Sequence, residues 1–323
     1  MTHDAVHDAI AHFNLEIAAI WPVPDSFSST VRLIELVTGE QLVLKIPYVK
    51  RKLFRELGAL EAFHGNLPVP DVIDVWVPDD DRPGALLLSR LPGVTIVGQV
   101  TVGLARQMGS LLGQLHTHRL DHYGDREEAG HPDAHDWWAM VHTVLDRWKP
   151  HCIQAVPPDL YARSLALYRD LAADLPAPDG PCWLHNDYRP GNILVVDGRI
   201  TGLIDFESAR GGSADRDFTK VSHYVWNPDP ATKPAFLAGY AEIRPVPDFE
   251  RTLTLYQLHN ALGGVAWCVR RTDTSDPFFH ENMAVIKRLT ARGGTLSYRS
   301  SQAHPVRHGV RERRVPDSGH SQP

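Results

Sequence analysis

The chain has 323 residues, of which 43% are hydrophobic and 22% are charged, so it is too apolar for global disorder. Its 39 acidic residues outnumber its 33 Lys and Arg, and the net charge of −6 disfavours nucleic acid as a partner. No apolar run approaches the roughly 20 residues that span a bilayer, and there is no signal-peptide pattern, so we expect a cytoplasmic protein without a membrane partner.

The first part of the chain is rich in strand patterns. The expected elements are, in order, a helix near the N-terminus, strands at 29–36 and 41–47, a helix at 52–64, and strands at 67–78 and 84–91. A Thr38-Gly39-Glu40 turn joins the first two strands into a hairpin. Residues 1–90 are therefore expected to form a small, β-rich N-terminal lobe.

From Thr101 onward the spacing of apolar residues becomes helical. The expected elements are a helix from 101, helices near 135–148 and 158–174, a strand-rich island at 181–206, and helical sequence from about 215 to 290. Residues 91–290 therefore predict a larger, mainly helical C-terminal lobe, and the fold class is α+β. Residues 291–323 hold six arginines against two acidic residues and predict a disordered basic tail.

The strand-rich island carries the polar residues with the most informative spacing. Asp197-Gly198 lies between two apolar runs and is a strong signal for a two-residue hairpin turn. Such a hairpin brings the segment before its first strand close to the segment after its second strand. We therefore expect Asp187, Asn192 and Asp205 to converge.

This set of residues suits phosphoryl transfer. The reaction needs oxygen ligands for Mg²⁺, which Asn192 and Asp205 offer, and a carboxylate that accepts the proton of the attacking hydroxyl, which Asp187 offers. The segment resembles the kinase pattern H-x-D-x-x-x-x-N followed by D-F. In that pattern Arg189 stands where protein kinases carry a lysine near the γ-phosphate, so we assign Asp187 and Arg189 to catalysis.

The N-terminal lobe supplies a second part of the same pattern. Only seven of the 33 basic residues are lysines, and Lys45 lies at the end of an apolar strand. Glu56 follows eleven positions later on the amphipathic helix. In a kinase, the strand lysine neutralises the α/β-phosphates of ATP and the helix glutamate holds the lysine in place. We expect Lys45 and Glu56 to pair and to bind ATP in this way.

The wider sequence resembles the aminoglycoside phosphotransferase and choline kinase-like family of small-molecule kinases. The resemblance covers about residues 10–290 and includes Leu67-Pro68-Val69-Pro70, the segment 87–93, the segment 113–116, and Gly212 with Asp217-Phe218. It implies a two-lobed, protein-kinase-like fold. It also implies that Asp217 braces the catalytic loop through His185 or the nearby backbone.

The resemblance assigns two further nucleotide-binding segments. It places Ser28, Ser29 and Thr30 in a loop that covers the phosphates, and it makes Ser89 and Leu91 the hinge that binds adenine through its backbone. The covering loop has no glycine, and the family's usual Gly-Asp-Pro before the bracing aspartate is replaced by 212–214, Gly-Ser-Ala. From the second departure we expect a weaker brace.

The sequence indicates the acceptor only indirectly. Residues 121–136 contain six acidic residues and a single arginine, which favours either a solvated loop or a site that attracts a cationic acceptor. The second interpretation assigns Glu127, Glu128, Asp133 and Asp136 to the acceptor.

The resulting hypothesis is an O-phosphotransferase that uses ATP and Mg²⁺ to phosphorylate a hydroxyl of a small cationic molecule, with an antibiotic as the favoured acceptor. One alternative is a kinase of a metabolite such as an amino alcohol or sugar. Another is a pseudokinase that binds without catalysis. A protein kinase is disfavoured, because only twelve positions separate Asp205 from Asp217, too few for an activation segment. The sequence leaves the oligomeric state open.

Overall fold

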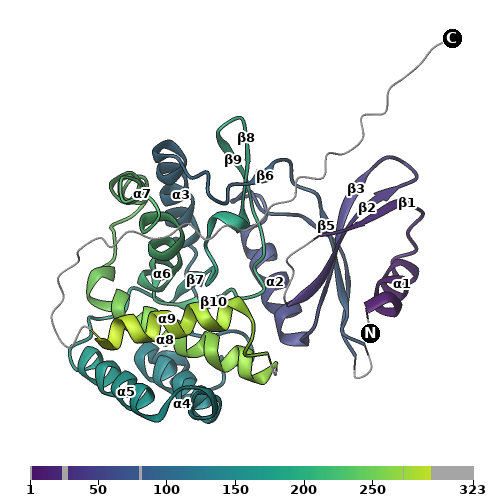
Figure 1. Cartoon of the computed structure of the whole chain (residues 1–323). Coiled ribbons are helices and arrows are strands. Elements are labelled where there is room, and N and C mark those ends of the chain that lie inside the picture. The colour runs from purple at the N-terminus through teal and green to yellow at the C-terminus, as the bar shows by residue number, and fades with distance from the viewer. Residues whose placement is uncertain (1, 24–27, 80–81, 272, 292–323) are drawn as a thin grey trace.

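The computed structural model describes residues 2–23, 28–79, 82–271 and 273–291. The predicted tail at 291–323 lies outside these residues, apart from its first position. The polypeptide forms two lobes, a smaller one built around a sheet and a larger one built mainly from helices (Figure 1). None of the helices in the described ranges is long and apolar enough to cross a membrane.

The smaller lobe consists of a five-stranded antiparallel sheet and two helices, one before the first strand and one between the third and fourth strands. Its elements are α1 (Thr2–His12), β1 (Ile17–Pro22), β2 (Ser29–Leu36), β3 (Gln41–Pro47), α2 (Lys50–Phe63), β4 (Val72–Trp76) and β5 (Ala85–Ser89). The strand order is β1-β2-β3-β5-β4, so β3 is central. The predicted hairpin is confirmed at its predicted boundaries, whereas β1 has no counterpart in the predicted elements.

The larger lobe begins with β6 and is otherwise mostly helical. Its helices and 3-10 turns are α3 (Val102–Leu115), η1 (Pro132–His135), α4 (Trp137–Ala155), α5 (Pro158–Ala172), η2 (Pro190–Asn192), η3 (Ala214–Asp217), α6 (Phe218–Val221), α7 (Thr232–Ala241), α8 (Phe249–Arg270) and α9 (Pro277–Ala291), and a π-helical turn, η4, spans Ser222–Trp226. Helix α4 extends beyond the predicted 135–148 because it continues through Pro150.

The short strands of the larger lobe hold the catalytic segment in place. They are β6 (Val94–Thr95), β7 (Cys182–Leu184), β8 (Ile193–Val196), β9 (Arg199–Leu203) and β10 (Arg210–Gly212). The predicted hairpin of β8 and β9 is confirmed, with Asp197 at φ 48° and Gly198 at φ 73° in its turn. Strand β7 pairs with β10, so the loop between β7 and β8 lies beside the loop between β9 and β10.

A hydrophobic core passes beneath this loop pair and joins the two lobes. Phe63 of α2 packs against Phe206, whose ring in turn packs against His185. Tyr188 is fully buried, and its hydroxyl donates to the carbonyl of Met108 in α3. The anchored loops therefore present their polar residues on a buried, packed base.

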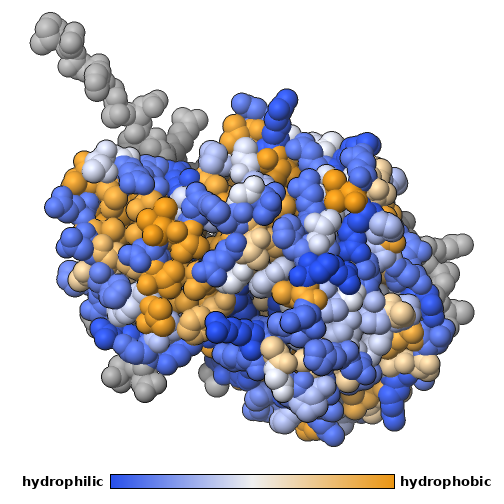
Figure 2. Space-filling model, turned by 180° about the vertical axis from the view of Figure 1, so that it is seen from behind, coloured by the Kyte–Doolittle hydropathy of each residue, from blue (hydrophilic) through white to orange (hydrophobic). Residues whose placement is uncertain are grey.

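On the face in Figure 2, apolar side chains gather over the smaller lobe.

Candidate active site

Lys45 lies on the central strand β3, paired on one side with Val31 and on the other with Leu86. Its Nζ is 2.6 Å from Glu56 Oε2, and the predicted ion pair is thus confirmed. The same Nζ is 2.6 Å from Asp205 Oδ1. Lys45, Glu56 and Asp205 come from three different elements. Their two ion pairs therefore connect the sheet, α2 and the loop after β9.

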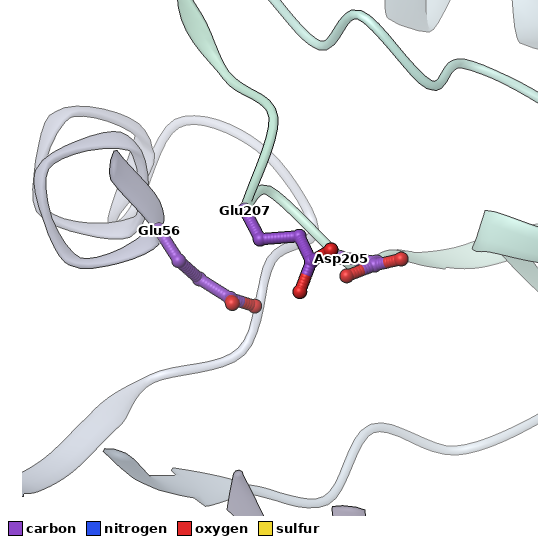
Figure 3. A group of neighbouring side chains, drawn as sticks. All are labelled: Glu56, Asp205 and Glu207. Atoms are coloured by element: carbon purple, nitrogen blue, oxygen red, sulfur yellow. The ribbon is translucent and has the colours of Figure 1, made fainter. Parts of the chain in front are cut away.

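A third carboxylate completes the group. Glu207 Oε2 lies 3.6 Å from Lys45 Nζ, and Glu207 Oε1 lies 2.8 Å from Lys52 Nζ. Figure 3 shows the carboxyl groups of Glu56, Asp205 and Glu207 converging from α2 and from the loop after β9. Three carboxylates therefore face two lysines, and this part of the site has an excess of negative charge.

The excess of negative charge shifts the pKa values of Lys45 and Glu56. Burial alone would lower the pKa of Lys45, but the charges of Glu56, Asp205 and Glu207 raise it well above its ordinary value. Burial raises the pKa of Glu56 to about 7, although the charge of Lys45 opposes this rise. Lys45 therefore stays protonated, and the three carboxylates around it share its single positive charge.

The arrangement fits the oxygen preference of Mg²⁺. The carboxylate oxygens of Glu56, Asp205 and Glu207 lie within 4.8 Å of one another. Asn192 is buried and donates from Nδ2 to the carbonyl oxygen (2.8 Å) and to Oδ2 (3.0 Å) of Asp187, so its amide oxygen is the atom left to face a cation. Amide and carboxylate oxygens are hard donors of the kind that Mg²⁺ prefers.

Asp187 is surrounded by cations. Its Oδ2 accepts from Arg189 Nε at 2.8 Å, and its Oδ1 lies 3.2 Å from Lys220 Nζ. Burial would raise the pKa of Asp187, but the charges of Lys220 and Arg189 outweigh it and lower this pKa to about 2. The carboxylate is therefore ionised at neutral pH and is able to accept a proton.

Lys220 was missed in the sequence because it lies in α6, 33 positions after Asp187 and outside every motif. The charge of Asp187 raises the pKa of Lys220, although burial works against this rise. The scarcity of lysines was the one available signal. It pointed to Lys45, and it applies equally to Lys220.

Asp217 braces the catalytic loop, as predicted. Its Oδ2 accepts from the backbone N–H of His185 and its Oδ1 from that of Asn186, both at 2.8 Å. His116 Nε2 contacts the same carboxylate at 3.2 Å. Both backbone hydrogen bonds of the brace are thus formed, and whether the Gly-Ser-Ala segment weakens the brace stays a prediction. Ser213 contributes its own contact by accepting from the N–H of Asp179.

The predicted covering loop ends earlier in the chain than expected. Ser28 precedes β2, but Ser29 and Thr30 are buried residues of β2 itself, paired with Pro47 and Ile46. Their assignment to a loop was therefore wrong, because the β-ladder already begins at Ser29. Phe27 lies outside the described residues. Whether Ser28 and Ser29 contact ATP stays a prediction.

The predicted hinge follows β5. Ser89 is the last residue of β5, and Leu91 lies two positions beyond it. The N–H of Ser89 donates to the carbonyl of Asp71, and its hydroxyl accepts from the N–H of Asp71 at 2.8 Å. These bonds fix the start of the segment between the lobes, and the adenine contacts remain a prediction.

The acidic residues of the 121–136 region already have partners within the protein. Glu127 Oε2 lies 3.3 Å from Arg51 Nε, and Glu128 Oε1 lies 2.8 Å from Arg51 Nη2. Asp133 accepts from the hydroxyl of Thr143 at 2.5 Å, and Asp136 accepts from the N–H of Ala139 as the N-cap of α4. These four carboxylates thus contact residues of helices α2 and α4. Whether any of them also contacts an acceptor molecule stays a prediction.

Comparison with known proteins supports the fold. The chain is similar in fold to a thermostable mutant of aminoglycoside phosphotransferase APH(4)-Ia in complex with ADP and hygromycin B, with a TM-score of 0.70 and 16% identity over 90% of this chain and 98% of that chain. It is also similar to macrolide 2'-phosphotransferase MphH from Brachybacterium faecium, with a TM-score of 0.59 and 20% identity over 88% and 98% of the two chains. The predicted two-lobed α+β fold is confirmed.

Sequence comparison gives relatives and a family. The chain is 27% identical over 180 residues to a homoserine kinase of Gluconobacter oxydans, which is 53% of this chain and 54% of that protein. A homoserine kinase of Gluconacetobacter diazotrophicus is 29% identical over 178 residues, 53% and 52% of the two chains. The match spans about half the length of these relatives. Residues 20–253 match the phosphotransferase enzyme family APH along most of both lobes, and the chain belongs to this family.

Proposed function

We propose that the protein is an ATP-dependent O-phosphotransferase that transfers the γ-phosphoryl group of ATP to a hydroxyl of a small molecule. The observation that carries this proposal is the carboxylate of Asp187, held beside Arg189 and Lys220 and hydrogen-bonded to Asn192. The carbonyl of Asn192 accepts from the N–H of Ile204, which directly precedes the Lys45 partner Asp205. Phosphoryl transfer needs a proton acceptor and flanking cations in this arrangement.

In this proposal each residue has one role. Asp187 accepts the hydrogen bond of the acceptor hydroxyl, orients its oxygen toward the γ-phosphorus and takes its proton. Arg189 and Lys220 stabilise the charge on the transferred group, and Lys45 binds the α/β-phosphates. Asn192 and Asp205 would hold Mg²⁺, with Glu207 nearby, and the ion would neutralise phosphate charge.

Two classes of acceptor have support. A cationic antibiotic is supported by the similarity in fold to aminoglycoside and macrolide phosphotransferases. A hydroxylated metabolite is supported by the similarity in sequence to homoserine kinases. The second class is also favoured by the geometry, because Glu128 and Asp136 are engaged with Arg51 and with the N-terminus of α4.

The test is a screen for acceptor-dependent ADP release with ATP and Mg²⁺. The panel contains aminoglycosides, macrolides, amino alcohols, sugars and hydroxy amino acids including homoserine. We expect one class to release ADP with the wild type and none to do so with Asp187→Asn. Asp174→Asn, a change at an exposed surface ion pair with Arg251, is the matched control.

Two outcomes contradict parts of the proposal. ADP release that is equal in the wild type and in Asp187→Asn would remove Asp187 from the mechanism. A complete lack of acceptor-dependent release, together with retained ATP binding, would identify the pseudokinase alternative. Expression in a sensitive bacterium separates the acceptor classes, because only an antibiotic kinase raises the inhibitory concentration of the drug.

A further inference from the structure

A small pocket opens in the larger lobe between α4 and α8 and next to β10. It is lined by Gly124, Trp137, Met140, Val141, Val144, Arg210, Arg216 and His259. Its wall is mostly apolar, but two of its residues are arginines. The pocket also adjoins the reaction centre, because Arg216 Nε donates to Asn186 Oδ1 at 3.2 Å and Asn186 directly precedes Asp187.

The guanidinium of Arg216 has only neutral partners among the described residues. Besides Asn186, its Nη2 donates to Asn260 Oδ1 at 3.1 Å and contacts His259 Nδ1 at 3.4 Å. His259 is neutral, since burial and the charge of Arg216 lower its pKa well below the ordinary value. The face of the guanidinium lies 5.3 Å from the ring centre of Tyr256. Its positive charge is thus in no direct ion pair there.

One nitrogen of the Arg216 guanidinium has no hydrogen-bond partner among the described residues. Arg216 is 8% exposed, and this nitrogen, Nη1, is buried. A buried charged donor without an acceptor is costly and is rare in folded proteins. Since Arg216 lines the pocket, an acceptor atom placed there, whether of a ligand or of a bound water, would satisfy Nη1.

Arg210 adds a second incompletely compensated charge. Its nearest carboxylate contact among the described residues is Glu128, at 4.0 Å. Glu128 is shared with Arg51 at 2.8 Å and with Arg147 at 3.3 Å. Burial, together with the charges of Arg55 and Arg216, lowers the pKa of Arg210 to about 9. Neither pocket arginine therefore has a carboxylate closer than 4.0 Å among the described residues, and the charges of Asp217 and Asp215 act on Arg216 without direct contact.

We propose that this pocket binds a carboxylate group of the acceptor, with Arg216 Nη1 as the principal donor and Arg210 as the second cation. A carboxylate is planar, carries one negative charge and presents two acceptor oxygens to a guanidinium. The inference rests on the proposed function and narrows its acceptor to small hydroxy acids, whose hydroxyl reaches Asp187 while the carboxylate occupies the pocket. It replaces the expectation of a purely cationic acceptor.

The first experiment compares acids with their amides on the full-length wild type. L-homoserine, L-serine and 4-hydroxybutyrate are each paired with the corresponding carboxamide, and kcat/KM for ADP release is measured. Calorimetric titration with each probe, in the presence of a non-hydrolysable ATP analogue, gives binding without turnover. We expect at least one acid to exceed its amide by about 30-fold or more, as for a buried charge pair that loses one partner. Equal values for every pair, or no binding of any acid, would overturn the proposal.

The second experiment asks whether Arg216 causes this preference. In Arg216→Gln the acid-to-amide ratio is expected to fall to about 1, whereas Arg216→Lys, which keeps the charge, retains part of it. Arg147→Gln is the matched control, because Arg147 belongs to the same charged cluster but does not line the pocket. Thermal unfolding shows whether each variant folds. If Arg216→Gln does not fold, the proposal is judged from the acid-to-amide ratios of the wild type and of Arg216→Lys.

The results separate this inference from the proposed function. If acids bind and their amides do not, but nothing is phosphorylated, the pocket stands and the kinase proposal falls. If acceptors without any carboxylate are phosphorylated and no acid binds, the kinase proposal stands and the pocket proposal falls. A ratio unchanged in Arg216→Gln would also remove Arg216 as the cause.

Discussion

The two halves of the active site have opposite charge balance. On the side of the small lobe, Lys45 is surrounded by Glu56, Asp205 and Glu207. On the side of the large lobe, the carboxylate of Asp187 lies between two cations, and Arg216 beyond it has no carboxylate in contact among the described residues. The first half is short of positive charge and the second half is short of negative charge.

This difference shows what each half is built to receive. Buried charges without partners are costly, so a protein retains them mainly where a ligand supplies the missing charge. A surplus of carboxylates suits the metal ion that accompanies a nucleotide. A surplus of cations suits the transferred phosphoryl group and an anionic acceptor. Four changes test the comparison.

The largest effect is expected from Asp187→Asn. The change removes the proton acceptor and should lower kcat by about a thousand-fold or more, because general-base catalysis contributes roughly 10²–10⁴-fold. ATP affinity, measured by calorimetry, should stay close to that of the wild type, since Lys45 and Asp205 are untouched. A large loss of ATP affinity would show that the two halves are not separate.

Lys45→Met tests the carboxylate-rich half. Without the ammonium, three carboxylates lose their shared cation, and the free energy of unfolding should fall by about 3 kcal/mol. Mg²⁺ should then stabilise the variant more than the wild type, because it replaces the missing charge. Chemical denaturation with and without Mg²⁺ measures both effects. Lys287→Met, at an exposed position of α9, is the control. Unchanged stability would mean that the carboxylates do not depend on Lys45.

Lys220→Met tests the cation-rich half through pH dependence. In the wild type, the pKa of Asp187 is lowered to about 2, so the base stays ionised and no loss of kcat/KM from this group is expected between pH 4 and 8. Without Lys220, burial raises this pKa, and activity is lost as pH falls through the new value. We expect a drop at pH 4–5 relative to pH 7 that the wild type does not show. Parallel profiles would argue against electrostatic control by Lys220.

The smallest effect is expected from Asp136→Ala. Loss of the N-cap of α4 should lower the free energy of unfolding by about 1 kcal/mol. The KM for any acceptor should not change, because this carboxylate caps a helix. Asp136→Ser, which keeps a capping oxygen and removes the charge, should restore stability. A raised KM for a cationic acceptor in both variants would instead return the 121–136 region to the binding site.

Local sequence patterns predicted much of this protein. The boundaries of β2 and β3 and the turn of the β8–β9 hairpin follow from strand propensity and from Asp197-Gly198, which involve only neighbouring residues. The spacing of the catalytic segment and the Lys45–Glu56 pair were also predictable, because strand–helix and hairpin connections of fixed length bring these residues together. Helix α4 was underestimated, since Pro150 does not end it.

By itself, the sequence predicted the two-lobed architecture, through local periodicity and the family resemblance. Its short-range spacing also singled out the residues that are proposed for phosphoryl transfer. Only the tertiary structure decided which charges meet. It placed Lys220 beside Asp187, paired Glu128 with Arg51, and left one nitrogen of Arg216 without a partner in the described part of the chain. The reason is physical: the partner of a charged side chain, and hence its pKa and its ligand, is set by distance and burial across elements far apart in the chain.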